Sequence, residues 1–227
     1  MNQKIRVNEV MAFILMVVCL FFLSSCATTQ TGSQESSFLK PGLYKDWQRM
    51  INELEIVQSF DLKNYSKIVM VQLDTSTTPL PARTDNTYAP AKNVINAADS
   101  FCWEGFKLAF DRAQPKPACA IFHTPVMPDH DPAAPSLVIR AKLAQLNPGS
   151  KAARFWVGFG AGKSFAVIEG EVIDSASGNA LLKFKTVRSS GFSLTGGDYE
   201  KFMSGDIRDI GTDIATMLLY FQNVKTE

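Results

Sequence analysis

The chain has 227 residues, of which 46% are hydrophobic, and its formal net charge is +1 at neutral pH. This charge balance argues against nucleic acid as the main partner, because phosphate binding needs a concentrated basic surface. The length is sufficient for one domain with a substantial core, or for two small ones at most. After the apolar run near the N-terminus, the sequence contains no further apolar run long enough to span a membrane.

The N-terminal region has the three parts of an export signal. Lys4 and Arg6 give a positive start, and an uninterrupted apolar run covers residues 10–23. This run is shorter than the about 20 residues that a membrane-spanning helix needs, and it fits a signal peptide. Residues 23–26, Leu-Ser-Ser-Cys, resemble the lipobox of bacterial lipoproteins. We therefore predict a signal peptide over residues 1–25; an ordinary signal peptide or an uncleaved anchor helix is the alternative.

The lipobox resemblance implies that the Cys26 thiol carries diacylglycerol and that palmitate is among the attached acyl chains. Several chains hold a protein stably on a membrane, whereas one binds only marginally. Ala27 follows Cys26, and it lacks the Asp that resembles an inner-membrane retention signal. We expect the outer membrane, periplasmic face. Residues 26–40 predict a lipidated flexible tether, and residues 41–227 a single periplasmic domain.

The first half of that domain begins with apolar residues at three- and four-residue spacing, which predicts a helix over residues 43–57. The dense apolar run at 68–73 predicts a buried strand. A second helix is predicted to begin near Pro90, because proline favours the first helical turn. The apolar stripe of this second helix ends near Ala113. The periodic positions of the first helix are Tyr44, Trp47, Met50, Ile51 and Leu54.

The second half predicts a short strand at 118–122, a longer one at 137–143, and a hairpin that joins 165–174 to 180–187. An amphipathic helix over 206–222 closes the domain. This order of elements predicts an α/β or α+β fold, with a mixed sheet of about four to six strands and helices packed on it. The hairpin charges agree: Glu169 and Glu171 alternate on one strand, Lys183 and Lys185 on the other, so they can pair across the strands.

A glycine-rich segment, residues 158–164, invites comparison with a phosphate loop. The spacing fails, because the position that needs the first glycine holds Val157, and residues 165–168 predict a strand where a helix is required. We predict neither nucleotide nor other cofactor. The glycines favour a bend or bulge. The surrounding aromatic and basic side chains are candidates for contact with a partner or with lipid; they are Arg154, Phe155, Trp156, Phe159 and Lys163. The alternative is that this segment is a plain structural loop.

Metal and disulfide chemistry have few candidate residues. With Cys26 lipidated, Cys102 and Cys119 form either a disulfide in the oxidising periplasm or two buried free thiols. His123 and the run 129–131, Asp-His-Asp, hold both histidines of the chain. A metal site needs three or four convergent ligands, and in this proline-rich loop the side chains are more typical of solvated ones, so no metal site is predicted.

The segment 147–164, the strand pair with Glu169-Gly-Glu-Val-Ile-Asp174, and the turn at 177–182 together resemble an uncharacterised bacterial lipoprotein family, domain-of-unknown-function family 4410. The runs 188–191, 196–198 and 210–215 are similar too, so the resemblance covers roughly residues 60–222. It implies a lipoprotein and no established activity. More loosely, the order of elements resembles the small α/β domain of lipoproteins that activate penicillin-binding proteins or build curli secretion pores, and fold alone does not license function.

Three functions stay open. The first is a non-enzymatic binding or accessory module whose partner is an envelope protein or polymer. The second is an oligomeric, membrane-assembling subunit of an export or surface-polymer system, motivated by the aromatic and glycine content of 147–164. The third is an enzyme on an envelope polymer, for which Glu169 and Asp174 are the best acids, although a charge pair and a turn account for both. We predict no catalytic residue.

Overall fold

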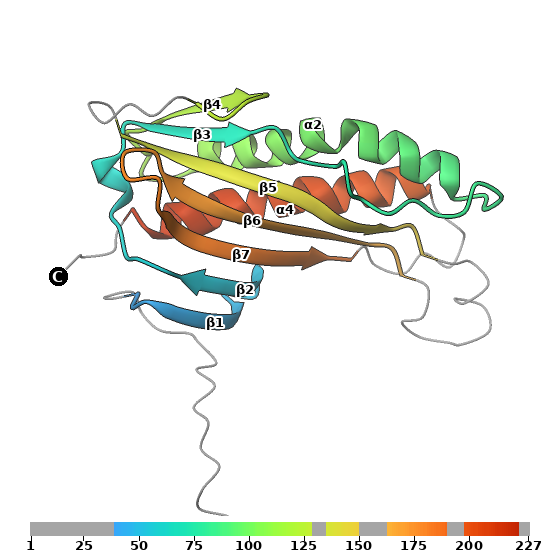
Figure 1. Cartoon of the computed structure of the whole chain (residues 1–227), viewed down its shortest axis with the longest axis horizontal. Helices are drawn as coiled ribbons and strands as arrows, with labels where there is room; N and C mark the ends of the chain where they lie inside the picture. Colours follow the sequence, from blue (N-terminus) through green and yellow to red (C-terminus); the bar gives the residue numbers. More distant parts are fainter. Residues whose placement is uncertain (1–38, 129–134, 150–162, 190–197, 223–227) are drawn as a thin grey trace, which may run out of the picture. The chain divides into compact units, whose positions relative to one another are not determined.

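The computed structural model describes residues 39–128, 135–149, 163–189 and 198–222. These residues form one seven-stranded sheet, in the order β1-β2-β7-β6-β5-β3-β4, with two long α-helices (Figure 1). The mixed α/β class agrees with the prediction, and the sheet is one strand larger than expected. None of the described helices combines the length and the apolar character needed to cross a membrane.

The sheet is antiparallel from β1 to β5 in its spatial order, and β3 and β4 continue it in parallel. The strands are β1 (Gly42–Trp47), β2 (Ile51–Ile56), β3 (Lys67–Val71), β4 (Ala120–Thr124), β5 (Ser136–Asn147), β6 (Phe165–Asp174) and β7 (Ala180–Arg188). The helices are α2 (Tyr88–Arg112), α4 (Tyr199–Tyr220) and the short 3-10 helix η1 (Leu62–Asn64). Strand β3 is parallel to both β4 and β5. The chain between β3 and β4 includes α2, the helical crossover that parallel strands usually require.

Residues 43–57 form a β-hairpin, so the predicted helix there is wrong. Its turn places Asp46, Gln48 and Arg49 at positive φ values of 48°, 50° and 58°. On β2 the buried Leu54 and Ile56 alternate with charged residues, because this strand pairs with β7. The same apolar residues also match a helical spacing, and the pairing in the sheet overrides that local pattern.

The other predicted elements are confirmed, with shifts at their ends. The strands expected at 68–73, 118–122 and 137–143 are β3, β4 and β5, and the hairpin is β6–β7. Helix α4 begins earlier than predicted. Asp198 caps it, since its carboxylate accepts hydrogen bonds from the backbone N–H groups of Glu200 and Lys201.

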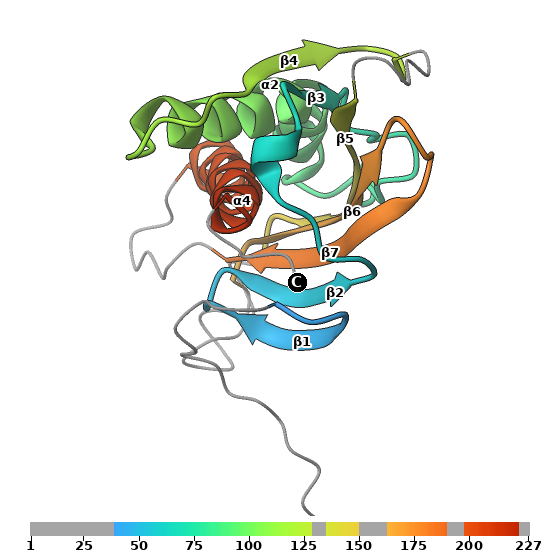
Figure 2. The ribbon, with the colours of Figure 1, turned by 90° about the vertical axis from the view of Figure 1, so that its left-hand side faces the viewer.

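Helices α2 and α4 pack against each other on one face of the sheet, and the core lies between them and the strands (Figure 2). Two glycines set how closely the helices approach. A Cβ at Gly105 would lie 1.9 Å from the carbonyl oxygen of Arg208, and one at Gly211 would lie 2.0 Å from that of Cys102. Only glycine permits this backbone contact.

The helix face of the sheet is mostly apolar, and an ion pair lies there near the end of β7. Arg188 donates from Nε and Nη2 to the two carboxylate oxygens of Asp213 on α4, at 2.6 and 2.5 Å. Burial raises the pKa of Asp213, and Arg188 partly offsets that rise. The pair thus connects the sheet to α4.

The opposite face, here the charged face, carries side chains sorted by strand. The register sets acidic strands beside basic ones. The residues are Glu53 and Glu55 on β2, Lys183 and Lys185 on β7, Glu169 and Glu171 on β6, and Arg140 and Lys142 on β5. Lys185 lies 3.3 Å from Glu169, as the hairpin predicted, whereas the ammonium of Lys183 pairs with Glu55 at 3.1 Å and Glu171 pairs with Arg140.

Candidate functional site

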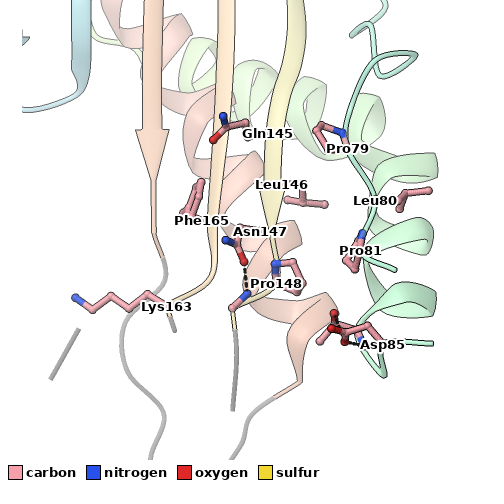
Figure 3. Close-up of a pocket in the computed structure, with 12 residues that line it drawn as sticks. Pro79, Leu80, Pro81, Asp85, Gln145, Leu146, Asn147, Pro148, Lys163 and Phe165 are labelled. Carbon is pink, nitrogen blue, oxygen red and sulfur yellow. Dashed lines mark hydrogen bonds between the residues drawn. The ribbon is translucent and has the colours of Figure 1, made fainter. Parts of the chain in front are cut away.

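A groove of about 650 Å³ lies at the end of the sheet where β5 stops and β6 starts (Figure 3). Its volume is in the range of about 300–1,000 Å³ that is typical of ligand sites. One wall belongs to the connection between β3 and α2 and consists of Pro79, Leu80, Pro81, Asp85 and Thr87. The other wall consists of residues 145–149 with Lys163 and Phe165.

The groove exists because β3 is shorter than β5. Strand β3 pairs with β5 from Ser136 to Ile139, and Asp74 extends the contact as an isolated bridge to Lys142. The Leu143 N–H donates to the Asp74 carbonyl oxygen at 2.8 Å, and the Thr78 hydroxyl donates to the Leu143 carbonyl oxygen at 2.6 Å. Beyond Leu143, β5 pairs with β6 on one side and borders the groove on the other. We call residues 144–147 the free end of β5.

A tight turn ends β5 at the groove. Gly149 has a φ of 77°, a conformation that glycine adopts without strain. The side-chain oxygen of Asn147 accepts a hydrogen bond from the Gly149 N–H at 2.7 Å, as Asn commonly does in turns. With Pro148 between them, these residues end the strand.

Asp85 has a structural task on the far wall. Its Oδ1 accepts hydrogen bonds from the backbone N–H and the hydroxyl of Thr87, at 2.8 and 2.7 Å. These bonds lower the pKa of Asp85. A carboxylate that is ionised and already bonded is poorly suited to general acid or base catalysis at neutral pH.

The remaining polar groups of the groove can donate and accept hydrogen bonds. They are the carboxamides of Gln145 and Asn147 and the exposed ammonium of Lys163, set among proline, leucine and phenylalanine side chains.

The structure describes one of the predicted contact residues. Lys163 lies in the groove wall and is exposed. Arg154, Phe155, Trp156 and Phe159 lie outside the described residues, as does Cys26. Gly149 and Lys163, which flank the segment 150–162, both line the groove.

Cys102 and Cys119 are free thiols in the structure, so the candidate disulfide is not formed there. Cys102 is fully buried on α2, where its carbonyl group contacts α4. Burial raises its pKa to about 12, and it also raises the pKa of Cys119. Both thiols stay protonated at neutral pH, and a protonated thiol is neither a good nucleophile nor a metal ligand.

His123 lies on β4 and contacts α2. Its Nε2 is 3.0 Å from Oδ1 of Asp99, and its ring stacks on Trp103 with centroids 5.1 Å apart. The same Asp99 oxygen accepts the Leu73 N–H at 2.8 Å. Residues 129–131 lie outside the described part of the chain. In the described part, no group of three or more potential metal ligands comes together.

The two acids considered for catalysis have structural partners. Burial raises the pKa of Glu169, but hydrogen bonds from Lys185 and Lys142 outweigh it, and the net shift is downward. Asp174 accepts from the Ala176 N–H at 3.0 Å and from the Ser177 hydroxyl at 2.8 Å. These are the charge-pair and turn roles that the sequence predicted for them.

The groove itself was not predicted. Its walls come from residues 79–87 and from residues 145–149 and 163–165, and no element or contact was predicted for the first of these. One signal was present in the sequence. Two prolines flank Leu80, and proline cannot continue a strand ladder, which indicates a wall that approaches the sheet without joining it.

The segment from the end of β4 through β7 is similar to a known domain family. The model of DUF4410, a domain of unknown function, matches residues 124–193. The resemblance found in the sequence is therefore confirmed over this stretch, which is narrower than the expected 60–222. The DUF4410 match includes the free end of β5 and the β6–β7 hairpin.

Several solved structures are similar to this chain at low sequence identity. A dodecameric PelC from Paraburkholderia phytofirmans is 12% identical with a TM-score of 0.42, over 76% of this chain and 98% of that one. A DUF330 protein from Xanthomonas campestris is 9% identical with a TM-score of 0.38, over 69% and 86%. A hypothetical protein from Chlamydia trachomatis is 10% identical with a TM-score of 0.35, over 69% and 98%. No curated protein matches the sequence.

Proposed function

We propose that the chain is a lipoprotein of the cell envelope that binds a partner in the groove and catalyses no reaction. Cys26 carries the lipid, and the protein faces the periplasm from the outer membrane. The observation that carries the binding role is the groove, whose walls include Gly149 and Lys163, the residues on either side of 150–162.

The binding role is tested by photo-crosslinking in cells. A photoreactive amino acid replaces Leu80 in the groove wall, and the control replaces Leu108 on α2, since the two side chains are 42% and 39% exposed. We expect adducts from position 80 and not from position 108. An adduct with a second copy of the chain would favour the oligomeric-subunit alternative, and equal or absent adducts at both positions would contradict a binding groove.

The anchor is tested separately by metabolic labelling with palmitate. Wild-type protein is expected to incorporate label and to fractionate with the outer membrane. Cys26→Ala is expected to abolish labelling, and Cys119→Ala, which removes a half-exposed thiol from the folded domain, is expected to leave it unchanged. Label that persists without Cys26 would refute lipidation at this residue.

A further inference from the structure

We propose that the groove is an open strand position, and that its ligand is an extended peptide segment of a partner protein that adds to the free end of β5. The inference rests on the proposed function, because it assigns the chemistry of the ligand to the same groove. Strand addition of this kind derives affinity from main-chain hydrogen bonds and specificity from pockets for alternate side chains.

The main chain of β5 is oriented for such an addition. Ala141 and Leu143 direct backbone groups to the side of β3, where Asp74 bonds the Ala141 carbonyl oxygen at 3.0 Å and the Leu143 N–H at 2.8 Å. Successive residues of a strand direct their backbone N–H and C=O groups to opposite sides. The register shift between Leu143 and Gln145 inserts one extra residue, so the alternation between the β3 side and the β6 side moves by one residue. The next backbone to face this side is that of Leu146. Leu146 lines the groove although its side chain is only 6% exposed.

The opposite wall does not fill this position. Pro79 and Pro81 have no N–H group, so this stretch cannot complete a ladder with β5. The Thr78 hydroxyl closes the groove at Leu143, which sets where an added strand begins. From there the free end of β5 extends for about 14 Å, given a rise of about 3.4 Å per residue.

The side chains around the groove indicate which peptide fits. Leu80, Pro81 and Phe165 provide apolar contacts, and the carboxamides of Gln145 and Asn147 can donate to and accept from a peptide (Figure 3). Asp85 is already bonded to Thr87. The groove therefore suits an extended segment with apolar side chains at every second position.

The test uses the full chain in detergent and a labelled, blocked peptide of alternating threonine and valine with a lysine at each end. A matched peptide has the same sequence with N-methyl groups on alternate residues, which remove the donors along one edge. Fluorescence anisotropy measures both, and hydrogen exchange follows the Leu146 amide. We expect the N-methylated peptide to bind at least about tenfold more weakly. We also expect the unmodified peptide to slow exchange at Leu146.

Two variants keep the outcome specific to the groove. Leu80→Arg is expected to weaken binding by about tenfold, and Leu108→Arg is expected to leave it unchanged. Equal binding of the two peptides, unchanged exchange at Leu146, or no binding of either peptide would overturn strand addition. The crosslinking from position 80 decides the proposed function independently, because it requires a ligand in the groove and not a strand.

Discussion

The two faces of the sheet show two ways in which one set of strands is stabilised. On the helix face, buried apolar side chains and the close contact of α2 with α4 leave little freedom for change. On the charged face, oppositely charged strands lie side by side, and most of these groups are substantially exposed to solvent. Burial of apolar surface contributes most of the stability, while exposed ion pairs typically contribute about 0–1 kcal/mol each.

The difference indicates a division of roles. The helix face supplies the free energy of folding, and the charged face specifies which strands are neighbours and in what register. A one-residue slip would turn every charged side chain of a strand toward the core, and a wrong neighbour would place like charges together. The predictions below test this division, beginning with the change expected to cost most.

Gly211→Ala is expected to destabilise the domain by about 3 kcal/mol, because its Cβ would lie 2.0 Å from the Cys102 carbonyl oxygen. Chemical denaturation measures the free energy of unfolding. The control is Gly205→Ala on the same helix, where a Cβ meets nothing within 4 Å. That variant should gain roughly 0.5–1 kcal/mol from helix propensity. Similar losses in both variants would contradict the helix contact as the cause.

Arg188→Met is expected to cost about 2–3 kcal/mol near neutral pH, because it leaves the buried Asp213 carboxylate unpaired. The pKa of Asp213 is already raised above 3.8 by burial, and without Arg188 it rises further. A raised carboxyl pKa favours folding when the group is protonated, so the deficit should shrink as the pH falls toward that pKa. Unfolding curves at neutral and mildly acidic pH test this. A deficit that grows in acid would contradict it.

The sequence predicts the strongly periodic elements of this fold. It does not predict the elements whose secondary structure depends on which strands pair in the sheet. Helices α2 and α4 and the β6–β7 hairpin follow from local patterns, since each buries one regular stripe. Strand β2 does not, because its apolar residues match helical and strand spacing equally well. The charged residues favour a strand here, because Glu53 and Glu55 repeat the spacing of Glu169 and Glu171. Both glutamate pairs lie on strands that flank β7.

The candidate site was less predictable than the fold. Lys163 was proposed as a contact and lies in the groove, but the groove depends on β3 ending at Val71 while β5 continues to Asn147. Strand ends are set by which neighbours remain to be paired, and that information is not local. The turn at Pro148 and Gly149 predicts only that β5 stops there.

Lys185→Glu is expected to destabilise the domain by about 1 kcal/mol, since it places a third carboxylate between Glu53 and Glu169 on adjacent strands. Added salt should reduce the loss, because exposed charges are screened. Lys67→Glu on β3 makes the same change of charge at an exposed position away from these strands, and it should leave stability nearly unchanged. A loss that is the same for both variants, or insensitive to salt, would argue against register control by the charged face.

Lys183→Gln is expected to have the smallest effect, within about 0.5 kcal/mol in thermal or chemical unfolding. Glu171 keeps its pair with Arg140, and Glu55, whose side chain is 47% exposed, regains water in place of Lys183. Neutralisation removes an attraction without creating a repulsion, so it tests stability apart from specificity. A small effect here beside a larger one for Lys185→Glu would show that the charged face acts by penalising wrong neighbours. A loss above about 1 kcal/mol would instead mean that these ion pairs stabilise the sheet directly.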